Sequence, residues 1–165
     1  MLKIDAGNGG VYELDHAVFD VNGTLTRDGY LVDGVIERVH ALRQLLKIHI
    51  LTADTYGTQE RLLNVALAVE VDPKIEWIIL KRSDGPEDQQ KEQYVIRLGD
   101  QRVAAVGNGR NDKLMLQKAK LGIAVIGPEG AFFETLAAAR VVAPDPISAL
   151  DLLLHPLRLK ATLRY

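Results

Sequence analysis

The fold of this chain is decided by the stretch Ala17-Val18-Phe19-Asp20-Val21-Asn22-Gly23-Thr24-Leu25-Thr26. Its apolar start, Ala17–Asp20, predicts a buried strand, and small polar residues follow that strand without a gap. Ligands of parallel sheets bind just beyond the carboxyl ends of the strands, so this placement indicates a site. Taken alone, Asn22-Gly23 is a common β-turn pair and favours a plain turn, so the interpretation as a site depends on the motifs in the rest of the chain.

Outside this stretch, short apolar runs rich in β-branched residues alternate with helical patterns. Strands are predicted near Ala17–Asp20, Ile48–Leu51, Trp77–Leu80, Val103–Val106, Gly122–Val125 and Val141–Val142. Helices are predicted near Asp33–Leu46, Thr58–Ala68, Glu87–Leu98, Asp112–Lys120, Ala131–Ala139 and Ile147–Leu154, the first of them capped by Asp33. This alternation predicts an α/β protein, a three-layer α/β/α fold around a doubly wound parallel sheet. Before it, Leu2–Ile4 and Val11–Tyr12 flank a glycine-rich turn and predict a β-hairpin.

Length and composition exclude several classes of protein. The chain has 165 residues, which suits one domain, 1–165, and its 47% hydrophobic content supports a packed core. A net charge of −2 argues against a nucleic-acid partner, and the absence of cysteine excludes thiolate zinc sites and cysteine nucleophiles. The chain shows no secretory signal and no run near the roughly 18 apolar residues of a membrane helix, so we expect a cytoplasmic protein without membrane contact.

Three carboxylates follow predicted strands or begin the segment after them. Asp20 ends the first core strand, Asp54 follows the second, and Asp112 closes the segment after the fourth. Carboxyl ends of parallel strands lie at one edge of the sheet, where clustered carboxylates repel one another unless a cation joins them. Hard oxygen ligands of this kind suit Mg²⁺. A carboxylate beside that metal can also attack phosphorus, with a lysine balancing the transferred charge.

Four motifs stand in a specific order: Asp20-x-Asn22-x-Thr24, Thr52, Lys91 and Gly107-Asn108-Gly109-Arg110-Asn111-Asp112. They resemble the motifs of the haloacid dehalogenase (HAD) superfamily, and within it those of the soluble P-type-ATPase-like phosphatases. The resemblance extends over nearly the whole chain. It implies a HAD-like Rossmannoid core and a Mg²⁺-dependent phosphohydrolase or phosphotransferase that acts through an aspartyl phosphate.

The resemblance also implies roles for individual residues. Asp20 would be the nucleophile and a Mg²⁺ ligand, and Lys91 would neutralise the phosphoryl group and orient Asp20. The backbone carbonyl of Asn22 and the side chain of Asn108 would complete the metal site, with Asp112 as a ligand or as a support for the ligands. The residues implied to bind the phosphoryl group or substrate are Gly23, Thr24, Thr52, Ala53, Asp54, Lys91 and Asn111.

Two residues depart from the superfamily pattern, and both replace a carboxylate by its amide. Asn22 stands where most members have an acid–base aspartate, so we expect low turnover or a long-lived phosphoenzyme. Asn108 keeps one oxygen donor but removes a negative charge from the metal site, so Mg²⁺ should bind more weakly. The alternative function is therefore a phosphate- or Mg²⁺-binding regulatory protein that has kept the fold and lost efficient turnover.

Simpler interpretations of the same motifs remain open at this stage. Asn111 or Asp112 can cap a helix, and Thr52 and Asp54 can be ordinary strand-to-helix residues. Lys81 and Arg82 rival Lys91 for the cationic role. A dinucleotide loop at Gly107-x-Gly109 is disfavoured, because Asp112 takes the place of the third glycine.

The spacing between motifs leaves no room for a large cap domain. Thr52 lies 32 residues after Asp20, which suffices for a small hairpin over Asp28–Asp33 and one helix. A capless site needs a second subunit or a large substrate to exclude water, so we expect a homo-oligomer. Its substrate would be a small phosphorylated molecule or a phosphorylated macromolecule. The basic, amphipathic end Leu157–Tyr165 is expected to dock on the domain or on a partner subunit.

Overall fold

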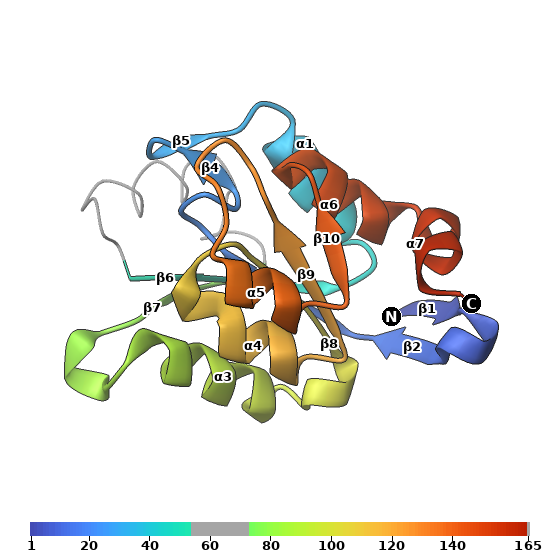
Figure 1. Cartoon of the computed structure of the whole chain (residues 1–165), viewed down its shortest axis with the longest axis horizontal. Coiled ribbons are helices and arrows are strands. Elements are labelled where there is room, and N and C mark those ends of the chain that lie inside the picture. The colour runs from blue at the N-terminus through green and yellow to red at the C-terminus, as the bar shows by residue number, and fades with distance from the viewer. Residues whose placement is uncertain (54–72, 165) are drawn as a thin grey trace.

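The structure is a computed structural model that describes residues 1–53 and 73–164. The helix predicted over Thr58–Ala68 and the candidate residue Asp54 lie outside the described residues. Figure 1 shows a central sheet with helices on both faces.

Six parallel strands form that sheet, in the spatial order β10-β9-β8-β3-β6-β7. Their bounds are β3 (His16–Asp20), β6 (Lys47–Thr52), β7 (Ile75–Ile79), β8 (Val103–Gly107), β9 (Leu121–Val125) and β10 (Val141–Ala143). All residues of β8 and β9 are buried, as expected for strands covered on both faces. The predicted three-layer α/β/α fold and all six predicted strands are confirmed.

The order of the strands reverses at β3. From β3 the chain first builds outward through β6 and β7, and later returns to place β8, β9 and β10 on the other side. The switch point therefore lies between β3 and β8, and doubly wound sheets bind their ligands in the crevice beyond such a point. Asp20 and Asn108 follow or end these two strands, so the topology brings them together.

Two sets of helices cover the two faces of the sheet (Figure 1). α1 (Val35–Leu42) and α6 (Pro146–Leu154) pack together on one face, where their apolar residues join the larger core cluster. α3 (Glu87–Arg97), α4 (Lys113–Lys118) and α5 (Phe133–Ala138) cover the other face, with Val95, Met115 and Leu116 in the second cluster. The described residues also include four short 3₁₀ turns: η1 (Gly7–Gly9), η2 (Arg82–Asp84), η3 (Asp100–Arg102) and η4 (Arg110–Asp112).

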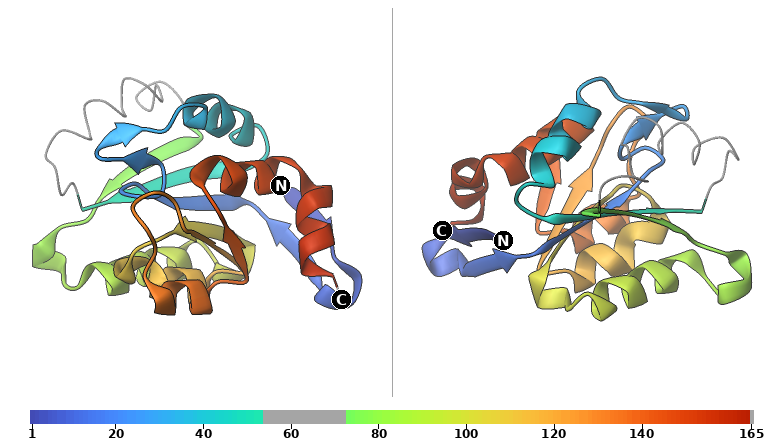
Figure 2. Two further views of the ribbon diagram at one scale, coloured as in Figure 1. Left: turned by 45° about the horizontal axis from the view of Figure 1, so that its top comes forward. Right: turned by 180° about the vertical axis from the view of Figure 1, so that it is seen from behind.

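The N-terminal hairpin and the C-terminal helix lie side by side at one end of the sheet, as both views of Figure 2 show. β1 (Leu2–Asp5) and β2 (Val11–Leu14) form the predicted antiparallel hairpin. α7 (Pro156–Leu163) packs against β1 and buries Leu159 in the main core. The predicted docking of the C-terminal segment on the domain is confirmed for the described residues.

Some boundaries differ from the sequence-based predictions. The helix predicted over Asp33–Leu46 forms only as α1, Val35–Leu42. Its N-cap is Gly34, at φ 85°, and Asp33 makes no cap, so that prediction was wrong. Gly34 places this left-handed turn directly before the helix, a backbone conformation that glycine adopts without strain.

A small hairpin does follow the first core strand, in a register slightly different from the predicted Asp28–Asp33. β4 (Thr26–Arg27) pairs with β5 (Tyr30–Leu31) across a two-residue turn. Both turn residues, Asp28 and Gly29, have positive φ, which is the geometry of a tight hairpin turn with Asp-Gly. No helix in the described parts of the chain is long and apolar enough to cross a membrane.

Candidate active site

The centre of the candidate site is a buried lysine between two carboxylates. Lys91 lies in the second turn of α3, and its side chain is 0% exposed. Its Nζ donates to Asp20 Oδ1 and to Asp112 Oδ1, both at 2.6 Å. Lysine is almost never fully buried unless it is paired, so these two contacts explain its place in the core. Lys81 and Arg82, the alternatives to Lys91, are exposed.

Both carboxylate oxygens of Asp112 accept hydrogen bonds from groups of the protein. Its Oδ1 accepts from Lys91, and its Oδ2 accepts from the backbone N–H groups of Asn108 and Gly109, each at 2.9 Å. The side chain of Asp112 therefore clamps the loop after β8 and holds Lys91 in place. Of the two roles expected for Asp112, this geometry favours support of the ligands.

Asn108 joins three segments of the site. Its Oδ1 accepts from the hydroxyl of Thr24 at 3.2 Å, and its Nδ2 donates to the carbonyl of Gly130 at 3.2 Å. An unprotonated aspartate cannot donate to that carbonyl, which gives the amide at this position a structural reason. The Thr24 hydroxyl therefore donates its proton to Asn108 in this structure.

Gly23 is required by the close packing of this loop. Its φ is +73°, and a Cβ built on it would lie 2.3 Å from Asn108 Nδ2. Such a contact is far below van der Waals distance, so any side chain at Gly23 would push Asn108 out of place. The Asn22-Gly23 turn and the site interpretation are thus compatible, because the turn serves to bring Asn108 close.

Strand register sets the neighbours of Asp20. On one side Asp20 pairs with Leu51, so Thr52 follows one residue later and is 1% exposed. On the other side Phe19 pairs with Val106, which brings Gly107 and Asn108 alongside the end of β3. Ala53, next to Thr52, and Asn22, two residues after Asp20, are both partly buried.

The charges of the cluster do not cancel. Burial, reinforced by the Asp112 carboxylate, raises the pKa of Asp20 to about 7, although the Lys91 ammonium acts against this shift. Burial also lowers the pKa of Lys91, but the attraction of Asp112 and Asp20 outweighs it, and the net pKa is raised. Lys91 therefore stays charged, and two carboxylates share one cation. A further positive charge at Asp20 would be stabilised.

The oxygen donors around Asp20 fit a Mg²⁺ ion. Asp20 has a second carboxylate oxygen, Asn108 Oδ1 keeps a lone pair, and the carbonyl of Asn22 lies in the same loop. Within the described residues, no group of three or more histidine and carboxylate side chains could hold a metal by itself. Mg²⁺ is usually held by one or two carboxylates together with water and phosphate oxygens, so this small set suffices.

Two hydrogen bonds at or near the site could not be predicted from the sequence. Glu129 accepts from the backbone N–H of Asp28 through Oε1 at 2.8 Å, which fastens the β4–β5 hairpin to the loop after β9. Asn111, which the resemblance implies as a substrate residue, donates through Nδ2 to Glu87 Oε2 at 3.0 Å. Both contacts join residues far apart in the chain, and the residue types alone do not indicate them.

Two histidines lie toward the opposite end of β3 from Asp20; His49 is buried and His16 is partly buried. His16 Nδ1 lies 2.9 Å from His49 Nε2, and His49 Nδ1 lies 2.9 Å from the hydroxyl of Tyr94. Tyr94 is three residues after Lys91 on α3, so this network fixes the rotation of the helix that presents the lysine. Burial lowers the pKa of His49 to about 4, and the imidazole is neutral at pH 7.

Comparison with known proteins identifies one relative by sequence and several by structure. No protein-family model matches the chain. An uncharacterized protein of Methanocaldococcus jannaschii is 51% identical over 65 residues, which cover 39% of this chain and 70% of that protein. This identity places the two chains in one family.

Solved structures share the fold at low sequence identity. A putative HAD family hydrolase from Streptomyces avermitilis superposes with a TM-score of 0.63 at 21% identity, over 86% of this chain and 84% of that one. The 3-deoxy-D-manno-octulosonate 8-phosphate phosphatase of Moraxella catarrhalis was solved in complex with magnesium, phosphate and KDO. It superposes with a TM-score of 0.66 at 16% identity, over 92% of this chain and 94% of that chain. A zinc-transporting PIB-type ATPase gives 0.60 at 21%, over 80% of this chain and 20% of that one.

Proposed function

The chain has the fold of the haloacid dehalogenase superfamily, and from this premise we propose that it is a Mg²⁺-dependent phosphohydrolase or phosphotransferase acting through an aspartyl phosphate on Asp20. The observation that carries the proposal is the buried Lys91 ammonium, held 2.6 Å from both Asp20 and Asp112 at the carboxyl edge of the sheet. A buried cation beside a carboxylate at the switch point is suited to phosphoryl transfer. Membership of the soluble P-type-ATPase-like group is part of the same proposal.

In the first step, a carboxylate oxygen of Asp20 attacks phosphorus. A bond forms between that oxygen and phosphorus, the ester P–O bond breaks, and the leaving alkoxide takes a proton from solvent. In the second step, the oxygen of a water molecule bonds to phosphorus, the bond between phosphorus and the Asp20 oxygen breaks, and a proton of the water passes to solvent. Orthophosphate leaves, and the Asp20 carboxylate is restored. Lys91 orients Asp20 before attack and balances the negative charge of the transferring group.

Asp20, the carbonyl of Asn22 and Oδ1 of Asn108 would hold Mg²⁺. The ion would supply positive charge to the phosphoryl oxygens. Asp112 would keep the loop of Asn108 in place through its contacts with the backbone N–H groups of Asn108 and Gly109. Thr52, buried one residue beyond the strand partner of Asp20, would donate its hydroxyl to the phosphoryl group.

Asn22 makes turnover slow in this proposal. An amide neither protonates the leaving group nor activates water, and a positioned acid–base group typically contributes about 10² to 10⁴ in rate. The phosphoenzyme should then persist. We infer a phosphorylated small molecule as substrate and a homo-oligomer as the assembly that shields the site.

The deciding experiment measures hydrolysis of para-nitrophenyl phosphate with Mg²⁺ by the parent chain and by Asp20→Asn. We expect the variant to lose activity, and peptide mapping by mass spectrometry to locate a phosphoryl group on Asp20 in the parent only. Asp5→Asn is the matched control, because Asp5 is exposed on the N-terminal hairpin and should leave the rate unchanged. Equal rates of hydrolysis for the parent and Asp20→Asn would refute the proposal that the protein is an enzyme acting through Asp20.

The second candidate function is a regulatory protein that binds phosphate or Mg²⁺ on the same fold. It is favoured by the two amides, Asn22 and Asn108, at positions where the superfamily usually has carboxylates. The same experiment separates the two candidates: a regulatory protein would bind Mg²⁺ and orthophosphate in calorimetry, with no turnover dependent on Asp20.

A further inference from the structure

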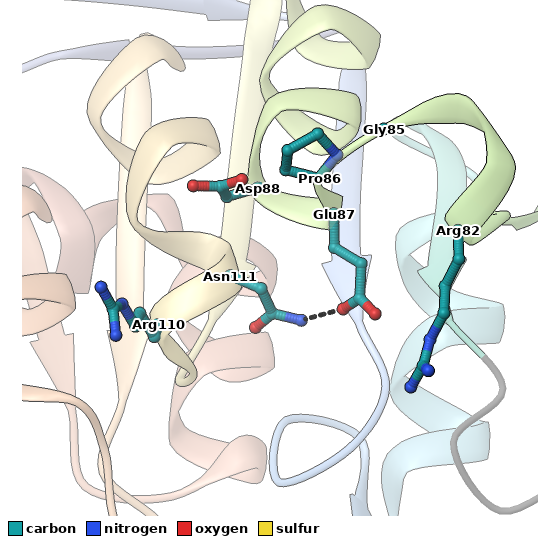
Figure 3. A pocket seen from close by; sticks show the side chains of 7 residues that line it. All are labelled: Arg82, Gly85, Pro86, Glu87, Asp88, Arg110 and Asn111. Carbon is teal, nitrogen blue, oxygen red and sulfur yellow. Dashed lines mark hydrogen bonds between the residues drawn. The ribbon is translucent and has the colours of Figure 1, made fainter.

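A cleft of about 750 Å³ opens beside the catalytic cluster (Figure 3). It lies between η2, the first turn of α3 and η4, and its lining includes Arg82, Glu87, Asp88, Arg110 and Asn111. A volume of this size accommodates a small organic molecule. Apart from Asn111, which the resemblance implies as a residue that binds the phosphoryl group or the substrate, none of these residues has a role in the proposed transfer of the phosphoryl group.

Two of the elements that line the cleft, α3 and η4, also carry Lys91 and Asp112 of the site. Glu87 precedes Lys91 by four residues, about one turn of α3, and therefore lies on the same face of the helix. Asn111 directly precedes Asp112, and its amide donates to Glu87 at 3.0 Å, so the two elements are joined across the cleft. The organic part of a substrate whose phosphoryl group is bound at Asp20 and Lys91 would thus have this cleft beside it.

Two arginines flank the Glu87–Asn111 contact on opposite sides (Figure 3). Over residues 1–53 and 73–164, neither Arg82 nor Arg110 forms an ion pair, and both side chains are exposed. The guanidinium carbon of Arg110 lies 5.8 Å from the centre of the Phe132 ring, which orders the side chain without using its N–H donors.

Each carboxylate of the cleft accepts a hydrogen bond from a neutral group and keeps its charge. Glu87 accepts from Asn111, and Asp88 Oδ1 accepts from the backbone N–H of Gln89 at 2.9 Å in the first turn of α3. Carboxylates only accept hydrogen bonds, so Arg82 and Arg110 are the charged donors that this lining offers to a ligand. A guanidinium presents a planar set of N–H groups that matches the two oxygens of a carboxylate or phosphate.

We propose that the substrate is a phosphomonoester whose leaving group carries a second oxyanion, a carboxylate or another phosphate, and that Arg82 and Arg110 bind that group in the cleft. This inference rests on the proposed function, because it takes the phosphoryl group at Asp20 as its fixed point. It makes the two arginines specificity residues for the organic part of the substrate.

The test compares three non-hydrolysable phosphonates by isothermal titration calorimetry with Mg²⁺. Propylphosphonate has an apolar tail, 3-phosphonopropionate ends in a carboxylate, and propane-1,3-bisphosphonate ends in a second phosphonate. We expect at least one of the two charged tails to bind tenfold or more tightly than propylphosphonate. Arg82→Gln and Arg110→Gln should each remove most of this gain in affinity, while the affinity for propylphosphonate stays unchanged.

Arg140→Gln is the matched control for net charge, since Arg140 is exposed after α5 and lies outside the cleft. The Arg140→Gln protein should bind the charged ligands more tightly than propylphosphonate by the same factor as the parent. A gain for only one of the charged tails supports the proposal and identifies the second oxyanion.

The proposal is overturned if propylphosphonate binds the parent as tightly as both charged ligands, or if the gain survives in both arginine variants. If none of the three ligands binds, the phosphoryl site itself is wrong, and the inference fails together with the proposed function. The Asp20→Asn assay detects that second case independently, because it needs no charged tail.

Discussion

Replacing Lys91 by methionine removes one ammonium group and little volume. Methionine has nearly the same length, so the core around α3 stays filled. What the variant loses is the electrostatic interaction of the ammonium group with the two carboxylates. The two carboxylates that accept from Nζ at 2.6 Å, Asp20 and Asp112, then remain buried without their cation. Breaking a buried ion pair by removing one partner costs about 3 to 5 kcal/mol. Domains of this kind are stable by about 5 to 15 kcal/mol, so Lys91→Met should lose about a fifth of the total or more.

Urea denaturation followed by circular dichroism at pH 7.5 without Mg²⁺ measures this loss. The informative partner is Asp112→Asn, because removing one carboxylate from the Lys91→Met protein relieves the repulsion. We expect the double variant to be less destabilised than the sum of the two single variants, with a coupling of 0.5 to about 3 kcal/mol. Lys118→Met, on the exposed face of α4, is the control and should change stability by less than about 0.5 kcal/mol.

Two results would refute the reasoning. A loss below about 1 kcal/mol for Lys91→Met would mean that the carboxylates are solvated or protonated, and that the lysine does not hold a charged cluster together. Strictly additive effects of Lys91→Met and Asp112→Asn would mean that the two side chains do not interact.

Three further outcomes are expected. Asn22→Asp should raise hydrolysis of para-nitrophenyl phosphate, by up to about 10²-fold, and an unchanged rate with intact folding and Mg²⁺ binding would count against the acid–base argument. His49 has a folded pKa of about 4 against about 6.5 unfolded, so the unfolded chain alone takes up this proton between those values and stability falls with acidification. From pH 7.5 to pH 5, His49→Gln should therefore lose about 2 kcal/mol less than the parent, as measured by urea denaturation, and equal losses would contradict the buried neutral imidazole. Glu129→Ala should speed hydrogen exchange at the Asp28 amide at least tenfold and raise KM, while Glu129→Gln keeps the acceptor and both values; identical exchange in the two variants would show that this contact does not hold the hairpin.

Local patterns carried most of the fold. The apolar runs predicted all six strands of the sheet, because strands buried on both faces need continuous β-branched and apolar residues. Helix ends were less predictable. The helix expected over Asp33–Leu46 shortened to Val35–Leu42, since Gly34 in a left-handed conformation forms its start. A local cap preference at Asp33 could not reveal that the preceding hairpin fixes where the chain enters the helix.

The site divides in the same way. The sequence by itself placed Asp20 and Asn108 at one edge, because carboxyl ends of neighbouring parallel strands have to meet there. Only the tertiary structure decided between Lys91 and its exposed rivals, Lys81 and Arg82, by burying one ammonium group between two carboxylates. Such choices depend on hydrogen bonds and burial between residues 21 to 84 positions apart, which no local pattern specifies.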